Sequence, residues 1–142
     1  MVTRVLSASV RVDGELISEI GPGLLVLAGI APTDDDSTIT KMATKIVEMR
    51  LFPDEAGRFA HSLREAGGSI LVVSQFTLFA DTRHGRRPGF TQSAPPEIAR
   101  SKIDAFIHQI RSLGVIVASG RFGEHMTVQS INDGPVTILL DM

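Results

Sequence analysis

The chain has 142 residues, a formal net charge of −2 and no cysteine. A chain of this length is typical of one domain, and 43% hydrophobic residues suit a protein with a packed core, so we expect a single domain over residues 1–142. The lack of cysteine excludes disulfides, thiolate metal sites and a cysteine nucleophile. Because the charge is nearly neutral, any contact with nucleic acid must depend on a local basic patch.

The N-terminal segment lacks the long apolar stretch of a signal peptide. No run approaches the roughly 20 apolar residues that a membrane-spanning helix needs. The sequence therefore predicts a cytoplasmic protein with no membrane contact.

The first part of the chain predicts three strands. Residues 2–12 alternate apolar and polar side chains, which is the period of a half-buried strand. Asp13-Gly14 is a strong signal for a two-residue hairpin turn, and residues 15–20 then form the returning strand. The continuous apolar run from Leu24 to Ile30 predicts a strand that is buried on both faces.

The middle of the chain predicts a helix and further strands. The helix begins at Asp34-Asp35-Asp36-Ser37, where the helix dipole favours acids. Residues 51–68 are rich in turn formers and hold one or two short strands. Residues 70–78 predict a second buried strand.

The last part begins with a polar loop over residues 80–96. Pro95-Pro96-Glu97 suits the start of a second helix, which ends near Gly114. Three more strands are predicted, at residues 115–118, 126–131 and 136–140. Runs of strands with two separate helices predict an α+β fold with largely antiparallel sheets.

The end of the second buried strand is partly polar, since Ser74-Gln75-Phe76-Thr77-Leu78 follows the apolar residues 70–73 without a turn. One interpretation is an ordinary strand end whose polar side chains point outward. The other is a pocket in which backbone N–H groups and hydroxyls stabilise a tetrahedral oxyanion.

The segment Asn132-Asp133-Gly134-Pro135-Val136-Thr137 is composed of turn residues, so its simplest interpretation is a hairpin turn. A Gly-Pro bond also has access to the cis form, and glycine lets a ligand approach the backbone closely. A rigid turn that presents main-chain carbonyls is therefore the alternative.

Three arginines, Arg83, Arg86 and Arg87, lie within five residues. They form either a solvated charged loop or a patch that contacts the phosphates of RNA. The four histidines show no metal-ligand spacing, and the sequence contains no nucleophile elbow, dinucleotide fingerprint or P-loop. No metal and no cofactor are predicted.

Two of these segments resemble the signature motifs of D-aminoacyl-tRNA deacylases. Ser74-Gln75-Phe76-Thr77-Leu78 is similar to the family's SQFTL motif, and Asn132 to Thr137 is similar to its NxGPVT motif. The resemblance runs nearly end to end, and the order and separation of the two motifs make it specific. At Phe59-Ala60 and Glu124-His125 the chain departs from the residues that are commoner in the family.

The resemblance implies largely antiparallel sheets in a barrel-like core, with two main helices packed outside. It also implies a homodimer with the active site at the subunit interface. Gly134 and Pro135, joined by a cis bond, would reach into the partner's pocket, where their carbonyls exclude L side chains. The implied substrate is tRNA charged with a D-amino acid or with glycine, which has no side chain to clash.

The resemblance also assigns roles to individual residues. Ser74, Gln75, Phe76 and Thr77 would line the reacting ester, with main-chain N–H groups from Gln75 and Phe76. Thr77 would position the ester or stabilise the oxyanion, while the 2′-hydroxyl of the terminal adenosine assists the reaction. The remaining residues implied at the site are Phe122, Gly123 and Met126 around the terminal adenine, and Arg4, which would brace the Gly-Pro loop.

Two other hypotheses stay open at this point. One is a non-catalytic tRNA-binding module that works through the arginines of residues 83–87. The other is an esterase that uses Thr77 as its nucleophile.

Overall fold

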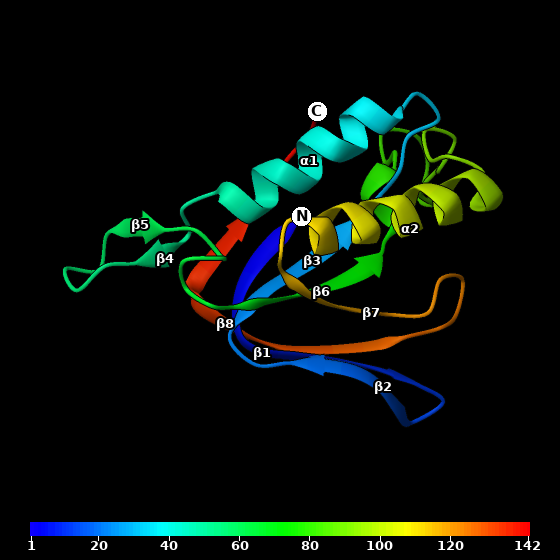
Figure 1. The fold of residues 1–142 in the computed structure, drawn as a ribbon. Coiled ribbons are helices and arrows are strands. Elements are labelled where there is room, and N and C mark those ends of the chain that lie inside the picture. Colours follow the sequence, from blue (N-terminus) through cyan, green and yellow to red (C-terminus); the bar gives the residue numbers. More distant parts are fainter.

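The computed structural model describes all 142 residues, with both α-helices packed on one side of a curved sheet (Figure 1). Strand β1 (Val2–Val12) turns at Asp13-Gly14 into β2 (Glu15–Ile20). Asp13 and Gly14 have φ values of 50° and 81°, so both adopt the left-handed conformation of a type I′ turn. The predicted hairpin is confirmed. Strand β3 (Gly23–Ala28) then pairs antiparallel with the first half of β1.

The main sheet has the order β2-β1-β3-β6-β7, with β8 paired to β1. Strands β6 (Ser69–Ser74) and β7 (Ile116–Ser119) extend it in parallel to β3, so the sheet is mixed. The Ser18 hydroxyl of β2 donates to the Ser119 carbonyl of β7 at 2.8 Å, which draws the two ends of the sheet together. The predicted α+β class, a barrel-like core with two helices outside it, is confirmed.

Strands β3 and β6 are buried on both faces, as the continuous apolar runs predict. Their alternate side chains enter two different cores. Leu24 and Val72 belong to the larger cluster, beneath the helices, whereas Leu25 and Leu71 belong to the smaller cluster inside the barrel. The C-terminal ends of these two strands therefore sit on a rigid base.

The two helices lie together on the outer face of the sheet. Helix α1 (Asp36–Glu48) is capped by the Asp35 carboxylate, which accepts from the Thr38 N–H at 2.7 Å. Helix α2 (Pro96–Ser112) starts with a proline in its first turn. Lys102 of α2 pairs with Asp36 of α1 at 2.7 Å. Neither helix is long and apolar enough to cross a lipid bilayer.

A small hairpin projects from the body between α1 and β6 (Figure 1). It consists of β4 (Phe52–Pro53) and β5 (Phe59–His61), which pair antiparallel. The prediction of one or two short strands in this region is confirmed.

The structure corrects the predicted strand over residues 70–78. Strand β6 ends at Ser74, and Phe76–Phe79 form a 3-10 helix, η1. The physical reason lies in the partner strand, because Ser74 is paired with Ala28, the last residue of β3. Beyond that pair the chain has no strand to bond with, and it turns.

The structure also corrects the hairpin turn predicted between residues 131 and 136. Strand β8 (Thr127–Ile138) is one strand, and both of its halves pair antiparallel with β1 in the same direction. Asn132 lies opposite Val5 and Thr137 lies opposite Thr3. The residues between them therefore bulge out of the strand instead of reversing it.

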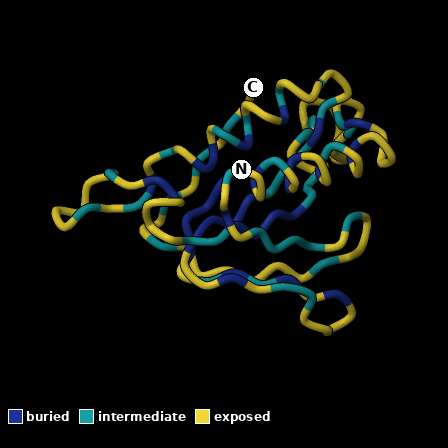
Figure 2. Tube along the Cα trace, in the orientation of Figure 1, coloured by how far each residue is buried: buried dark blue, intermediate teal, exposed yellow.

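Strand β8 is the least protected part of the sheet. It pairs only with β1, so its other edge is open, and none of its 12 residues is buried (Figure 2). Leu6 of β1 and Val128 and Ile131 of β8 are apolar and exposed. A long, open, partly apolar edge strand of this kind is a surface that proteins normally cover.

Candidate active site

The turn after β6 places the Ser74-Gln75-Phe76-Thr77 segment at the edge of the sheet. The N–H of Gln75 donates to the Ala28 carbonyl at 2.8 Å. Within η1, the Leu78 N–H donates to Gln75 and the Ala80 N–H donates to Thr77. The first N–H groups of a helical turn have no acceptor inside that turn. The amides of Phe76 and Thr77 are therefore the free donors here, and the main-chain donor expected from Gln75 is already in use.

The Thr77 hydroxyl has an amide as its partner. The Gln75 side chain donates to it through Nε2. A carboxamide nitrogen does not accept a proton, so this contact orients the hydroxyl without making it a nucleophile. Phe76 is 57% exposed and packs edge to face on Phe90, with ring centroids 5.0 Å apart. This packing fixes the start of η1.

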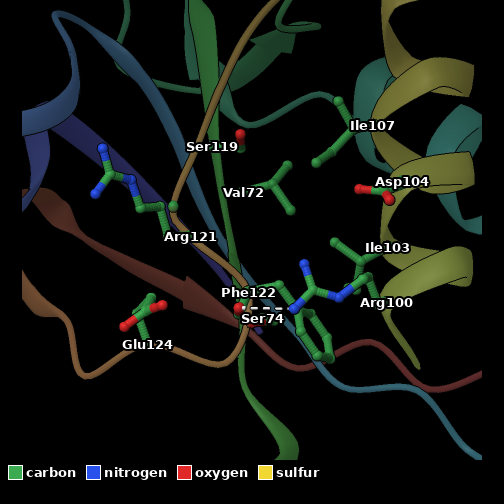
Figure 3. A pocket seen from close by; sticks show the side chains of 11 residues that line it. Val72, Ser74, Arg100, Ile103, Asp104, Ile107, Ser119, Arg121, Phe122 and Glu124 are labelled. Carbon is green, nitrogen blue, oxygen red and sulfur yellow. Dashed lines mark hydrogen bonds between the residues drawn. The ribbon is translucent and has the colours of Figure 1, made fainter. Parts of the chain in front are cut away.

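A pocket of about 370 Å³ opens beside this turn, between the carboxyl ends of β6 and β7 and helix α2 (Figure 3). Crevices at the carboxyl ends of parallel strands are common ligand sites. Charged side chains of both signs line it, together with Val72, Ser74 and Phe122. The charged residues are Arg100, Asp104, Arg121 and Glu124.

Phe122 lies in the turn that connects β7 to β8, and it lines this pocket. The turn starts where the Gly120 N–H donates to the Val72 carbonyl at 3.0 Å. Gly123 has a φ of 83°, a conformation that suits glycine. Met126, at the end of the same turn, is partly buried and packs against the core inside the barrel. Phe122 lines the pocket directly, and Met126 lies against Gly120, which also lines it.

The bulge of β8 carries Gly134 and Pro135 on the surface, and their peptide bond is cis, as the resemblance implies. The Asn132 carboxamide closes the base of the bulge. Its Oδ1 accepts from the Val136 N–H at 3.0 Å, and its Nδ2 donates to the Thr137 hydroxyl at 3.1 Å. The bulge is thus a defined structure within the chain itself.

Arg4, the residue expected to brace the Gly-Pro loop, contacts the bulge from beneath. It is only 7% exposed. Its Nε lies 3.1 Å from the Asp133 carbonyl and 3.0 Å from the Asp133 carboxylate. Its Nη1 donates to the Leu51 carbonyl at 2.6 Å, and its guanidinium lies 5.9 Å from the Phe59 ring centroid. Arg4 therefore ties the bulge to the β4–β5 hairpin.

The two signature segments lie far apart in one chain. The bulge is opposite Arg4, which pairs with Leu24, whereas Ser74 pairs with Ala28. Four residues along the strands and three strand spacings across them separate the two, or roughly 20 Å. Figure 1 shows them toward opposite ends of the sheet.

The segment between Asp81 and Gly89 carries Arg83, Arg86 and Arg87, and we call it the arginine loop. Two hydrogen bonds between Asp81 and Gly89, of 2.8 and 2.9 Å, close its base. Arg83 binds the Asp81 carboxylate with both Nε and Nη2, at 2.9 and 2.7 Å. This bidentate contact lowers the pKa of Asp81 and raises that of Arg83. Arg86 and Arg87 are exposed and form no ion pair.

Several site residues were not found from the sequence. Arg100 was missed because it lies on α2 outside the apolar stripe, where an exposed arginine carries no signal of its own. Asn132 and Asp133 were assigned to a turn, and only the structure shows that their polar groups close and anchor the bulge. No group of three or more histidine and acidic side chains is placed to hold a metal.

The pocket and the bulge lie on a nearly closed barrel with two outer helices. A family model of D-Tyr-tRNA(Tyr) deacylases matches residues 1–141. The D-aminoacyl-tRNA deacylase of Thermomicrobium roseum is 53% identical over 141 residues, which cover 99% of this chain and 92% of that protein. The enzyme of a Roseiflexus species is 54% identical, with 99% and 91% covered.

Two solved structures share the fold. One, a c-Myc DNA Unwinding Element Binding Protein, has a TM-score of 0.93 and 40% identity, and covers 99% of this chain and 96% of that one. The other, a probable eukaryotic D-amino acid tRNA deacylase, has a TM-score of 0.79 and 18% identity, with 94% and 93% covered. The chain belongs to the D-Tyr-tRNA(Tyr) deacylase family. This confirms the predicted family and the predicted enzyme class, an ester hydrolase.

Proposed function

We propose that this protein hydrolyses the ester between a D-amino acid and the terminal adenosine of tRNA, and that it spares L-aminoacyl-tRNA. The observation that carries the proposal is the joint presence of the free-amide turn after β6 and the Gly134-Pro135 bulge in a chain of this family. A substrate of this kind is cytoplasmic, and we place the enzyme in that compartment.

The chemistry requires water to add to the ester carbonyl. The resulting tetrahedral intermediate then expels the 3′-oxygen of the adenosine, which takes up a proton, and the products are the free amino acid and tRNA. The amides of Phe76 and Thr77 are the donors that would stabilise the oxyanion. Thr77 has only an amide partner. This supports assistance by the substrate's 2′-hydroxyl over attack by Thr77.

The site needs two copies of the chain. In one chain the bulge and the β6 turn are separated by roughly 20 Å. The open edge of β8 and its exposed apolar residues supply a surface for a homodimer. In that dimer the Gly134-Pro135 bulge of one subunit would enter the pocket of the other. Its main-chain carbonyls would occupy the space that an L side chain needs, while glycine would be accepted.

The tRNA would lie against the arginine loop. Because Arg83 is paired with Asp81, Arg86 and Arg87 are the cations free to contact phosphates. Binding through them should weaken steeply with salt.

The test is deacylation of D-Tyr-tRNA, L-Tyr-tRNA and Gly-tRNA under the same conditions. We expect turnover of the D and glycyl esters and at least about 100-fold slower turnover of the L ester, as expected when one bound form clashes. Equal rates for D- and L-Tyr-tRNA would show that the bulge does not select chirality.

Two other functions make different predictions. The name of the similar solved structure, a c-Myc DNA Unwinding Element Binding Protein, favours nucleic-acid binding, and the first alternative is such binding without turnover. That function predicts salt-dependent binding of uncharged tRNA or DNA and no hydrolysis at any enzyme concentration. A Thr77 esterase predicts that Thr77→Ala abolishes turnover while a 2′-deoxy substrate still reacts. The substrate-assisted scheme predicts the reverse.

A further inference from the structure

Arg100 makes two contacts with a single residue of the pocket, Phe122. Its guanidinium carbon lies 4.8 Å from the centroid of the Phe122 ring, and its Nη2 donates to the Phe122 carbonyl at 3.3 Å (Figure 3). The two residues come from different elements, α2 and the turn between β7 and β8. Arg100 therefore links helix α2 to both the side chain and the main chain of Phe122 in the turn.

The turn has few other attachments near its tip. At its start the Gly120 N–H is bound to Val72, and inside it a longer bond of 3.3 Å joins the Glu124 N–H to the Arg121 carbonyl. Gly123, which follows Phe122, adopts a left-handed φ of 83°. The ring of Phe122 also packs against the larger hydrophobic cluster, so Arg100 and that cluster, rather than the turn itself, hold it at the pocket.

The charge of the pocket indicates which part of a substrate fits beside Phe122. Two cations, Arg100 and Arg121, are balanced by Asp104 and Glu124. A phosphate would meet no net positive charge here. A neutral planar heterocycle, in contrast, gains from an aromatic ring and a guanidinium plane, on both of which bases stack.

We propose that Arg100 is a positioning residue for the terminal nucleoside of the substrate, acting through Phe122. This rests on the proposed function, since it assumes that the nucleoside enters this pocket. The planar guanidinium lies over one face of the ring and holds the Phe122 main chain, so the part of the ring that lines the pocket keeps its place beside the base. A lysine provides the charge without the planar stack, so it cannot replace this role.

The experiment measures binding of a non-hydrolysable D-tyrosyl-adenosine amide, which has no phosphate, by calorimetry with the whole protein. Arg100→Ala should weaken binding about five- to tenfold, and Arg100→Lys should not restore it. Arg111→Ala is the matched control. Arg111 lies on the same helix and also donates to a main-chain carbonyl, that of Val117, at 3.3 Å. It should bind the analogue as the parent chain does.

Kinetics with D-Tyr-tRNA supply the second readout. Arg100→Ala should raise KM with kcat nearly unchanged, and its effect should vanish in a Phe122→Leu background, because Arg100 acts through that ring. Full rescue by Arg100→Lys, or equal binding by the Arg100→Ala and Arg111→Ala proteins, would overturn the inference. The unmutated protein distinguishes failure of the proposed function from failure of the role of Arg100. If it binds the analogue but leaves D-Tyr-tRNA intact, the proposed function fails, whereas the binding comparison still decides the role of Arg100.

Discussion

Arg4 is the residue on which the bulge depends most. Its buried guanidinium joins β1 to Asp133 and to the Leu51 carbonyl. A cation that is 7% exposed is stable only because its donors are satisfied. The sequence indicated Arg4 only through a family resemblance, since one arginine in a strand has no periodic or compositional signal of such a role.

Arg4→Ala should lower the free energy of unfolding by about 2–3 kcal/mol, because it leaves buried acceptors without a charged donor. Urea denaturation measures this. Arg11→Ala is the control, since Arg11 lies on the same strand and donates to Gly14 from an exposed position. Its cost should be below about 0.5 kcal/mol. Equal small losses in both variants would contradict the anchoring role of Arg4.

A substitution at Phe76 can remove a single proposed oxyanion donor, its amide hydrogen. Phe76→Pro deletes the amide hydrogen, and proline fits the first position of a helical turn. We expect kcat on D-Tyr-tRNA to fall by about 100-fold or more. Phe76→Ala removes the ring that packs on Phe90 but keeps the N–H, and it should retain most of the activity. Similar losses in the two variants would assign the effect to the ring instead.

At the scale of elements, the sequence predicted most helices and strands because their apolar periods and caps are local. Two elements were wrong for a non-local reason. The end of β6 depends on where β3 ends, and the sequence of residues 70–78 alone does not indicate that position. The Asn132 to Pro135 segment has the composition of a turn. Only the common pairing of both halves of β8 with β1 makes it a bulge.

In the arginine loop, the ion pair between Asp81 and Arg83 leaves Arg86 and Arg87 as the unpaired cations. The Arg83 guanidinium lowers the pKa of Asp81, so the carboxylate is ionised and Arg83 is paired with it at neutral pH. Asp81→Asn should release Arg83 as a third free cation. We expect tighter tRNA binding and a plot of log K against log salt that is steeper by up to about one unit. An unchanged slope, measured by fluorescence titration at several salt concentrations, would mean that the loop does not face the phosphates.

At the scale of the whole molecule, the central feature is the distance between the two halves of the site. The strand register places the bulge and the β6 turn toward opposite ends of one sheet. The resemblance implied that two subunits share each site, and the proposal of a shared site rests on this separation. Composition and periodicity alone do not reveal this, because the separation arises from how three strand pairs are aligned.

Complementation between two defective variants tests the shared site most directly. In Gly134→Ala, the new Cβ would lie 2.7 Å from Val136 Cγ2, at a φ of 132° that L residues rarely adopt, so the bulge is disrupted. In Phe76→Pro, the β6 turn is defective. Each homodimer should be nearly inactive on D-Tyr-tRNA. The heterodimer, isolated with two different tags, has one site with both intact halves and should recover about half of the parent activity. A heterodimer as inactive as its parents, or a protein that stays monomeric, would contradict a site shared between two chains.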